Sequence, residues 1–374
     1  MRIGIDGRLL GYKQGVGRHV WELISGASRL VPENEYFVYV KTRGLQQVRG
    51  EGTVRPNVRI VQVDGAPFLL REQVAFARAV HRDRLDLLHV TFDHGLPLWA
   101  PDKVVLTIHD AWFERDSYFR SNWTRRYYHV MTRRGLRKAQ CVLTVSNFVR
   151  EKILKYCPWM RHRGAKLKVV PNGVGREFRP DVAARCSMLR TYGVERYILY
   201  VGLLAAHKNV LGILEGYGRL CQRFSDPPPL VMAGACHPPL AAAVEAARRR
   251  FGPKVIFLGH VPDEELPALY RGADLFVFPS FHEGFAIPIV EAMACGIPVI
   301  TANVAAMPEV AGDAALLVDP ANSESIQAAM AIVLSDAAVR QGLVARGLRR
   351  AQEFSWEKMA RQVVEVYDAV RAGN

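Results

Sequence analysis

Residues 275–294, LFVFPSFHEGFAIPIVEAMA, join an apolar strand, predicted over Leu275–Pro279, to the start of a helix. Two carboxylates, Glu283 and Glu291, therefore lie around one helix N-terminus, where free N–H groups favour a diphosphate. Gly284 lets the backbone approach such a ligand closely because it has no Cβ. Acidic residues are also common helix caps, so these residues alone leave a purely structural role open.

The same alternation of strand and helix extends in both directions from this stretch. Seven strands are predicted before the midpoint, over 2–6, 36–41, 58–63, 87–91, 104–109, 141–145 and 167–170. Six follow, over 197–201, 230–233, 255–258, 275–279, 298–301 and 315–318. Strands that alternate with helices indicate parallel sheets covered on both faces. We therefore predict an α/β protein of two Rossmann-like, doubly wound domains that face each other across a cleft, with a linker over 171–190.

Size and composition agree with this fold class. The 374 residues suit two domains, and the content of 49% hydrophobic and 23% charged residues is typical of a folded globular protein. The start, MRIGIDGRLL, reads as a strand rather than an export signal, and no apolar run reaches the roughly 18 residues of a membrane span. We expect a cytoplasmic protein. The six scattered cysteines form no C-x-x-C pair, so we expect them to be reduced and bind no zinc.

The formal net charge of +14 indicates attraction to polyanions. Nucleic acid, anionic lipid and phosphorylated small molecules all remain open on charge alone. A basic nucleic-acid-binding protein is one alternative, although the chain contains no recognised nucleic-acid-binding motif. We therefore expect no nucleic-acid partner.

Further polar residues follow three predicted strands. His207 and Lys208 come just after 197–201, where a compact ammonium can neutralise a diphosphate or lie in a solvated turn. His109 and Asp110 end another strand, where the imidazole can bond a sugar hydroxyl or the neighbouring backbone. Gly15-Val-Gly17 precedes a helix predicted to begin near His19, and its backbone can approach a phosphate. A dinucleotide-binding fingerprint needs a third glycine where this chain has Val20, which disfavours a hydride-transfer enzyme.

Glu283-Gly-Phe-x-x-Pro288-x-x-Glu291 resembles the E-x7-E signature of the family-4 retaining glycosyltransferases, which have the GT-B fold. Other segments resemble this family in the same order: Thr107–Asp110, Val145–Phe148, Pro171–Val174, Val201–Asn209, Phe257–Val261 and Met307–Gly312. The resemblance extends from Gly4 to Trp356.

The resemblance implies a metal-independent hexosyltransferase with no cofactor. Residues 1–175 would form the acceptor-side domain, 176–355 the nucleotide-sugar-binding domain, and 356–374 a helix that crosses back to the first. The implied catalytic residues are His109, Lys208 and Glu283. The implied donor-binding residues are Gly15, Gly17, Asp110, His207, Lys208, Gly284, Phe285, Glu291, His260 and Val261. The family often carries arginine at the position of His207.

The pattern resembles mannosyltransferases in particular, so we expect a nucleotide-diphosphate sugar donor, with GDP-mannose favoured. The acceptor would be a glycan or a polyprenyl-diphosphate-linked saccharide, in the synthesis of cell-surface polysaccharide or lipid-linked saccharides. A sugar-nucleotide epimerase of the same fold is the enzymatic alternative, and it would need no acceptor.

The segment 118–138 is both basic and aromatic. On a helix, one face would carry Phe119, Trp123, Tyr127 and Val130, flanked by Arg120, Arg126, Arg133 and Arg137. Such a face suits an anionic membrane surface, which would make the protein peripheral on the inner face of the cell membrane. A core-packed helix with solvated charges is the alternative.

Overall fold

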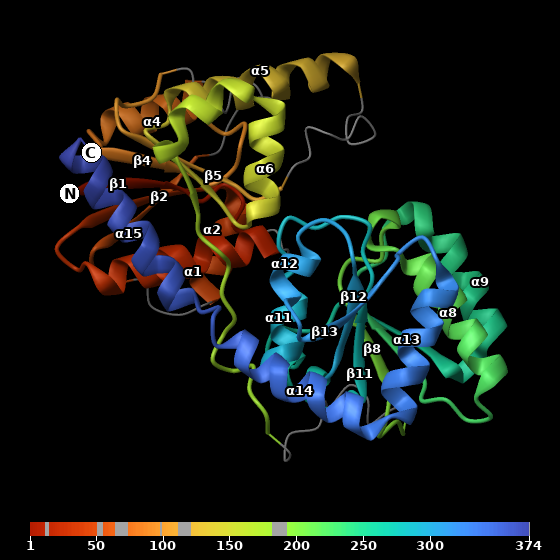
Figure 1. Ribbon diagram of the computed structural model, residues 1–374. Coiled ribbons are helices and arrows are strands. Elements are labelled where there is room, and N and C mark those ends of the chain that lie inside the picture. The colour runs from red at the N-terminus through yellow and green to blue at the C-terminus, as the bar shows by residue number, and fades with distance from the viewer. Residues whose placement is uncertain are drawn as a thin grey trace. The chain divides into compact units, whose positions relative to one another are not determined.

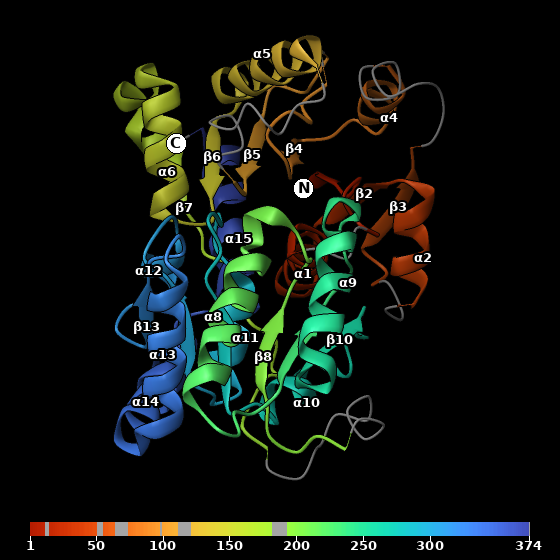
Figure 2. The ribbon, with the colours of Figure 1, turned by 90° about the vertical axis from the view of Figure 1, so that its right-hand side faces the viewer.

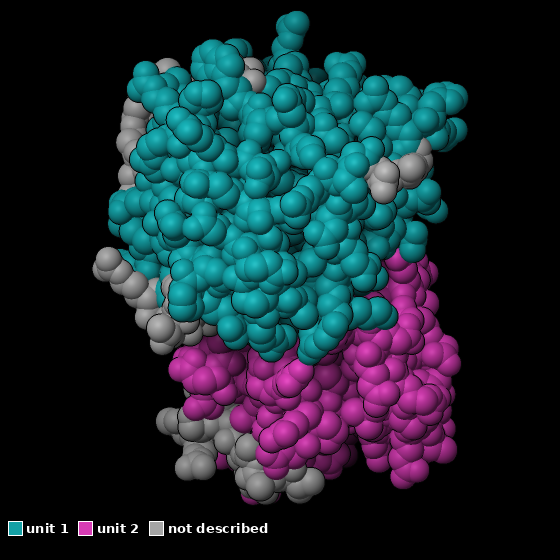
Figure 3. All heavy atoms as spheres, turned by 90° about the vertical axis from the view of Figure 1, so that its left-hand side faces the viewer, with its two compact units in different colours: residues 1–172, 356–374 teal, residues 173–355 magenta. Residues whose placement is uncertain are grey.

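The computed structural model describes residues 1–11, 15–50, 55–63, 74–97, 99–110, 121–181 and 193–373 (Figure 1). The chain divides into two compact units, which are coloured separately in Figure 3. Unit 1 comprises residues 1–172 and 356–374, and unit 2 comprises residues 173–355. The division after Asn172 lies just before the predicted domain boundary at 175, and the last helix belongs to unit 1.

Unit 1 is built on a parallel sheet of seven strands in the order β3-β2-β1-β4-β5-β6-β7. The strands are β1 (Arg2–Asp6), β2 (Glu35–Val40), β3 (Val58–Gln62), β4 (Leu87–Val90), β5 (Val104–Ile108), β6 (Cys141–Thr144) and β7 (Leu167–Val169). Strands β4, β5 and β6 are buried along their whole length, which explains why they read as uninterrupted apolar runs.

Helices cover both faces of this sheet. Helix α1 (Gly15–Leu30) packs against α15 (Trp356–Ala372) on one face, and α4 (Phe76–Arg82) and α5 (Asn122–Lys138) lie over the other (Figure 1). The remaining described helices of this unit are α2 (Thr42–Gly50), α6 (Asn147–Tyr156) and the 3-10 helix η4 (Pro158–Lys166). The unit is therefore a three-layer α/β sandwich.

Unit 2 repeats this plan with six parallel strands in the order β10-β9-β8-β11-β12-β13. They are β8 (Ile198–Val201), β9 (Leu230–Ala233), β10 (Val255–Gly259), β11 (Leu275–Phe278), β12 (Val299–Ala302) and β13 (Ala315–Val318). Helices α8 (Val210–Arg223), α9 (Ala241–Phe251) and α13 (Ser323–Ser335) lie on one face (Figure 2). Helices α10 (Leu266–Arg271), α11 (Ile287–Ala294) and α14 (Ala337–Ala351) lie on the other, and α12 (Met307–Ala311) connects β12 to β13.

The predicted α/β class and all thirteen predicted strands are confirmed, each end within one residue. The predicted start of the first helix near His19 is wrong, because α1 begins at Gly15. Gly17 is buried on the same face as Val20 and Leu23, and this packing outweighs the low helix propensity of glycine. Gly15 and Gly17 therefore form the first turn of the helix and not a loop before it.

Strand order reverses between β8 and β11 in unit 2, and between β1 and β4 in unit 1. Ligands of doubly wound sheets bind beyond the carboxyl ends of the strands at such reversals. Across the described ranges, no single helix is long and apolar enough to cross a membrane, and only the bent pair α13 and α14 passes that test jointly.

Candidate functional site

Asn209 joins several loops at the carboxyl edge of the unit 2 sheet. It lies in the left-handed region (φ 58°) between β8 and α8, and it is 4% exposed. Its side-chain Nδ2 donates to the carbonyl of Pro279 at 3.0 Å and to that of Pro320 at 2.7 Å. The loops after β8, β11 and β13 are therefore fixed to one another by a single buried amide.

Backbone hydrogen bonds continue this network around Glu283. The amide of Phe281 donates to the carbonyl of His207 at 2.9 Å, and the amide of Ala306 donates to the carbonyl of Glu283 at 3.3 Å. The loop after β11 is thus held on one side by the β8 loop and on the other by the β12 loop. The side chains on these loops are presented from a fixed backbone.

Lys208 and Glu283 form an ion pair at this edge. The Lys208 Nζ lies 2.5 Å from Oε1 of Glu283, and the two side chains are 19% and 12% exposed. The ammonium also lies 5.4 Å from the ring centroid of Phe278. Each charge is balanced by the other, so neither is left unpaired in this largely buried position.

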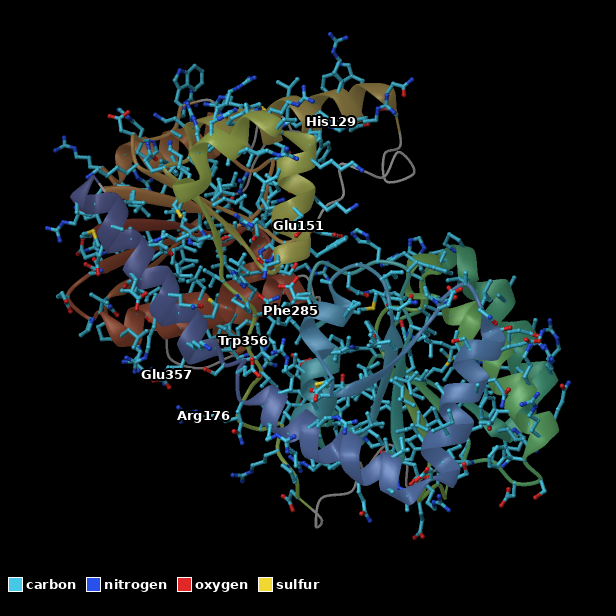
Figure 4. The ribbon with its side chains drawn as sticks, viewed as in Figure 1. His129, Glu151, Arg176, Phe285, Trp356 and Glu357 are labelled. Atoms are coloured by element: carbon cyan, nitrogen blue, oxygen red, sulfur yellow. The ribbon has the colours of Figure 1, made fainter. Side chains whose placement is uncertain are left out.

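Helix α11 begins one short turn beyond Glu283. Its N-cap, Ala286, has φ 74° and ψ 64°, a conformation that non-glycine residues seldom adopt. The helix proper begins at Ile287, so Gly284 and Phe285 precede it. The ring of Phe285, labelled in Figure 4, is 5% exposed and packs edge-on against Phe354 at 5.5 Å. Phe285 can therefore offer a ligand its backbone but not its ring.

Tyr270 orients the second predicted carboxylate. Its hydroxyl donates to Oε2 of Glu291 at 2.9 Å, and its side chain is fully buried. Burial, and then the charge of Glu291, raise the pKa of the Tyr270 hydroxyl well above its usual value. The hydroxyl therefore keeps its proton and acts as a fixed donor to Glu291.

Close backbone packing shapes the loops after β8, β9 and β10. A Cβ placed on Gly234 (φ +143°) would lie 1.9 Å from the carbonyl oxygen of Gly202, so no side chain fits there. The amide of Gly234 in turn donates to the carbonyl of Gly259 at 2.7 Å. Beyond Gly259, His260 is exposed and Val261 is 4% exposed. The family-like segments Val201–Asn209 and Phe257–Val261 thus lie at the ends of β8 and β10, on either side of the loop that follows β9.

In unit 1, His109 lies just past the end of β5. Its Nε2–H donates to the carbonyl of Thr91 at 3.1 Å. Burial first, and then the neighbouring His19, hold the pKa of His109 well below its ordinary value. The ring is therefore neutral at physiological pH. Asp110 follows it and is half-buried.

Two family profiles together match nearly the whole chain: Glycosyltransferase Family 4 over residues 13–178 and Glycosyl transferases group 1 over 189–367. The O-antigen chain mannosyltransferase B of Escherichia coli is 34% identical over 295 residues, which is 76% of this chain and 75% of that protein. This chain is a family-4 glycosyltransferase of the GT-B fold.

Other relatives of this glycosyltransferase also carry mannosyltransferase names. The serotype-specific mannosyltransferase WbdA of Escherichia coli is 27% identical over 235 residues, 61% of this chain and 28% of that protein. The phosphatidyl-myo-inositol mannosyltransferase of Mycolicibacterium smegmatis is 31% identical over 218 residues, 56% of this chain and 54% of that protein.

Solved structures support the fold. The Anabaena protein Alr3699/HepE, crystallised with UDP and glucose, superimposes with a TM-score of 0.77 at 17% identity, over 99% of this chain and all of that one. WaaG, a glycosyltransferase involved in lipopolysaccharide biosynthesis, gives a TM-score of 0.74 at 15% identity, over 98% of this chain and 99% of that one.

The glycosyltransferase fold brings some predicted residues together within each unit. In unit 2, Lys208 contacts Glu283 directly, and His207 is joined to the same loop through its backbone. Glu291 lies further along, in the second turn of α11. In unit 1, His109 lies against α1, whose first turn holds Gly15 and Gly17.

Three supporting residues of unit 2 escaped prediction. Tyr270 lies in the short helix α10, Gly234 follows a strand, and Asn209 lies in what reads as a solvated turn. Each acts on a residue or loop far away in sequence, and no local pattern signals such a contact. Within the described residues, no group of three or more His, Cys, Asp or Glu side chains could hold a metal ion.

Proposed function

We propose that this glycosyltransferase transfers mannose from GDP-mannose to a glycan or lipid-linked acceptor, with retention of anomeric configuration, in the synthesis of a cell-surface polysaccharide. The observation that carries the choice of sugar is the 34% identity to an O-antigen mannosyltransferase over three quarters of both chains. The mannosyltransferase names of two further relatives support the same choice.

In this proposal the Lys208–Glu283 ion pair exchanges partners when the donor binds. The diphosphate brings negative charge, and the Lys208 ammonium moves from the carboxylate to the β-phosphate. Glu283 is then left with oxygen atoms that accept hydrogen bonds from the donor sugar. The 2.5 Å contact between the two side chains supports this exchange, because both already point to one place.

The leaving diphosphate is stabilised by Lys208 and by the backbone amides that precede α11. Preorganised donors aimed at a developing charge are commonly the largest contribution to catalysis. The C1–O bond to the diphosphate breaks, the acceptor oxygen bonds to C1 on the same face, and the acceptor's proton passes to the departing phosphate oxygen. The proposal needs no metal ion and no cofactor, because these groups supply the positive potential.

Glu291 is assigned to the ribose hydroxyls of the donor nucleotide, and His109 to a hydroxyl of the donor sugar. The hydrogen bond from Tyr270 supports the first assignment, since it fixes one carboxylate oxygen and thereby orients the other. The neutral ring of His109 supports the second, since its Nδ1 lone pair can accept a hydroxyl proton. Binding of a nucleoside diphosphate, GDP above all, is the experiment that tests the proposed donor.

We propose further that α5 holds the enzyme on an anionic membrane surface. Among the described residues of the helix, exposed side chains recur at intervals of three and four: Trp123, Arg126, Val130, Arg133 and Arg137. Trp123 is 61% exposed and Val130 is 57% exposed. The helix contains no Asp or Glu over its length. A stripe of basic and apolar side chains suits a lipid surface.

This stripe differs in part from the predicted face. Tyr127 is half-buried and stacks on Trp123, with ring centroids 5.9 Å apart. Phe119 and Arg120 lie outside the described residues. Two arginines of the stripe also pack on aromatic rings. The guanidinium carbon of Arg133 lies 5.0 Å from the ring centroid of Tyr156, and that of Arg137 lies 5.5 Å from the ring centroid of Trp159.

Replacing Arg126, Arg133 and Arg137 together by glutamine is expected to weaken binding to phosphatidylglycerol vesicles about 100-fold, since each basic side chain near such a surface contributes about 1 kcal/mol. Vesicle co-sedimentation at low and high salt measures the effect. The matched control replaces the exposed arginines Arg223, Arg249 and Arg349 of unit 2 and should bind like the wild type. A role for α5 would be contradicted if both triple variants lost the same affinity for phosphatidylglycerol vesicles. It would also be contradicted if the wild type bound phosphatidylcholine vesicles as tightly as phosphatidylglycerol vesicles.

A further inference from the structure

Three segments of unit 1 meet at the buried side chain of His19, which is 2% exposed. His19 lies in the second turn of α1, after Gly15 and Gly17. Its ring meets that of His109 edge-on, with centroids 4.5 Å apart and an interplanar angle of 81°. Its Nδ1 lies 2.8 Å from Oδ1 of Asn172, in the turn that follows β7.

A fourth group closes the environment of His19. Trp356, labelled in Figure 4 at the start of α15, lies edge-on to the His19 ring at 6.4 Å between centroids. His19 is therefore enclosed by the ends of α1, β5 and α15 and by the chain at Asn172. Asn172 is also the last residue of unit 1 before the chain enters unit 2.

The hydrogen bonds set the proton positions on both rings. An amide oxygen can only accept, so His19 Nδ1 carries the proton that it donates to Asn172. Nε2 of His19 then holds a lone pair, and this buried atom has no hydrogen-bond partner within the described chain. Burial lowers the pKa of His19 to about 4, so the ring stays neutral.

His109 is the complementary case. Its Nε2–H is committed to the carbonyl of Thr91, so its Nδ1 holds the lone pair. The Thr91 contact fixes one end of the ring, and the nearly perpendicular His19 ring packs against it. An apolar aromatic ring would fill the space beside His109 equally well. His19 instead makes a hydrogen bond to Asn172 and has a second buried nitrogen without a partner among the described residues, which a space-filling role does not require.

We propose that His19 is a positioning residue for His109. Its ring packs against that of His109 and keeps the His109 Nδ1 directed toward the substrate. Its hydrogen bond to Asn172, at the boundary of the unit, fixes the orientation of the His19 ring itself. The inference rests on the proposed function in one respect, namely that His109 contacts the donor sugar. It adds a residue that touches no substrate and acts through another side chain.

Two substitutions separate the ring contact from the hydrogen bond. His19→Ala removes both, whereas His19→Phe keeps a ring against His109 and removes only the bond to Asn172. We expect kcat for GDP-mannose turnover to fall about 30-fold in His19→Ala and about fivefold in His19→Phe, effects of the size expected for misplaced catalytic groups. The Kd for GDP should stay at the wild-type value, because the nucleotide is assigned to unit 2. Asn172→Ala should match His19→Phe, and the double variant should show no further loss.

The second readout is the imidazole nitrogen NMR spectrum of His109, which requires no substrate. We expect the Nε2–H tautomer alone in the wild type and in His129→Phe, and a mixture of tautomers in His19→Ala. His129→Phe is the matched control, because His129 lies in the same unit and its ring also makes a hydrogen bond with the Tyr156 hydroxyl. Thermal unfolding of each variant shows whether the fold is kept, and His19→Phe carries the test if His19→Ala does not fold.

The outcomes separate this inference from the proposed function. An unchanged His109 spectrum together with an unchanged kcat in the His19 variants overturns the positioning role, even if GDP binds. If no nucleoside diphosphate binds the wild type, the proposed function fails, and the spectrum alone decides whether His19 orients His109. Equal losses of kcat in His19→Phe and His129→Phe would also overturn the inference.

Discussion

In Glu283→Ala, kcat for GDP-mannose is expected to fall at least about 1000-fold while GDP still binds. Removal of a group that acts mainly in the transition state lowers kcat by about this factor. The reason lies in the ion pair with Lys208. Without the carboxylate, the donor sugar loses its hydrogen-bond acceptor, but the ammonium remains for the diphosphate. Because Lys208 no longer has to leave a partner, GDP should bind the variant as tightly as the wild type or several-fold more tightly.

Initial rates of GDP release and calorimetric titration with GDP measure the two effects separately. Glu283→Gln keeps the shape and an amide oxygen, and should recover part of kcat but not all of it. Glu264→Ala, at an exposed position of unit 2, is the control and should behave like the wild type. Loss of GDP binding together with turnover in Glu283→Ala would refute the assignment of Glu283 to the sugar.

Lys208→Met is expected to weaken GDP binding about 100-fold, because a charge-assisted hydrogen bond to phosphate is lost and about 2–3 kcal/mol goes with it. Methionine keeps an unbranched side chain close to the length of the aliphatic part of lysine, but it lacks the ammonium that lies 5.4 Å from the ring centroid of Phe278. The variant also leaves the Glu283 carboxylate without its cation, and that carboxylate then repels the diphosphate.

Comparison of GDP with guanosine identifies the part of the ligand that Lys208 senses. Guanosine lacks phosphate, so its affinity should not change in Lys208→Met. Lys254→Met, at an exposed lysine of the same unit, is the matched control. Equal weakening of guanosine and GDP would show that the substitution damages the whole nucleotide site, and unchanged GDP affinity would remove Lys208 from it.

Most of the fold could be predicted because the central strands of both sheets are buried on both faces. Strands such as β5 and β11 consist of residues that are all buried, and their apolar runs are visible in the sequence. Helix ends were harder to place. The start of α1 depends on packing of its buried face, including Gly17, which the local preference of glycine does not reveal.

Residues of the candidate site could be predicted only where a local sequence signal, such as a motif or a strand end, marks them. Glu283 and Glu291 share one segment, and Lys208 follows a strand end. Their supports come from elsewhere: Tyr270 reaches Glu291 from α10, and Asn209 reaches the carbonyl of Pro320. Asn209 reads as a solvated turn residue because His207 and Lys208 precede it, but its amide is buried by loops distant in sequence.

His19 illustrates the same limit in unit 1. In the sequence it is one polar residue within an amphipathic helix, and its partners His109, Asn172 and Trp356 lie far along the chain. Only the folded unit brings these four side chains together. A sequence motif does not reveal residues that orient other side chains, because their partners lie far away in the sequence.

The central claim, that this chain uses a nucleoside-diphosphate sugar and specifically a guanosine donor, is tested most directly by thermal unfolding of the wild-type protein with GDP, UDP and ADP. A ligand present at about a hundred times its dissociation constant stabilises a protein by roughly 2.7 kcal/mol. We expect GDP to raise the unfolding temperature clearly more than UDP or ADP, and the increase to disappear in Lys208→Met. A larger increase with UDP or ADP would contradict the guanosine donor, and no increase with any of the three would contradict the account as a whole.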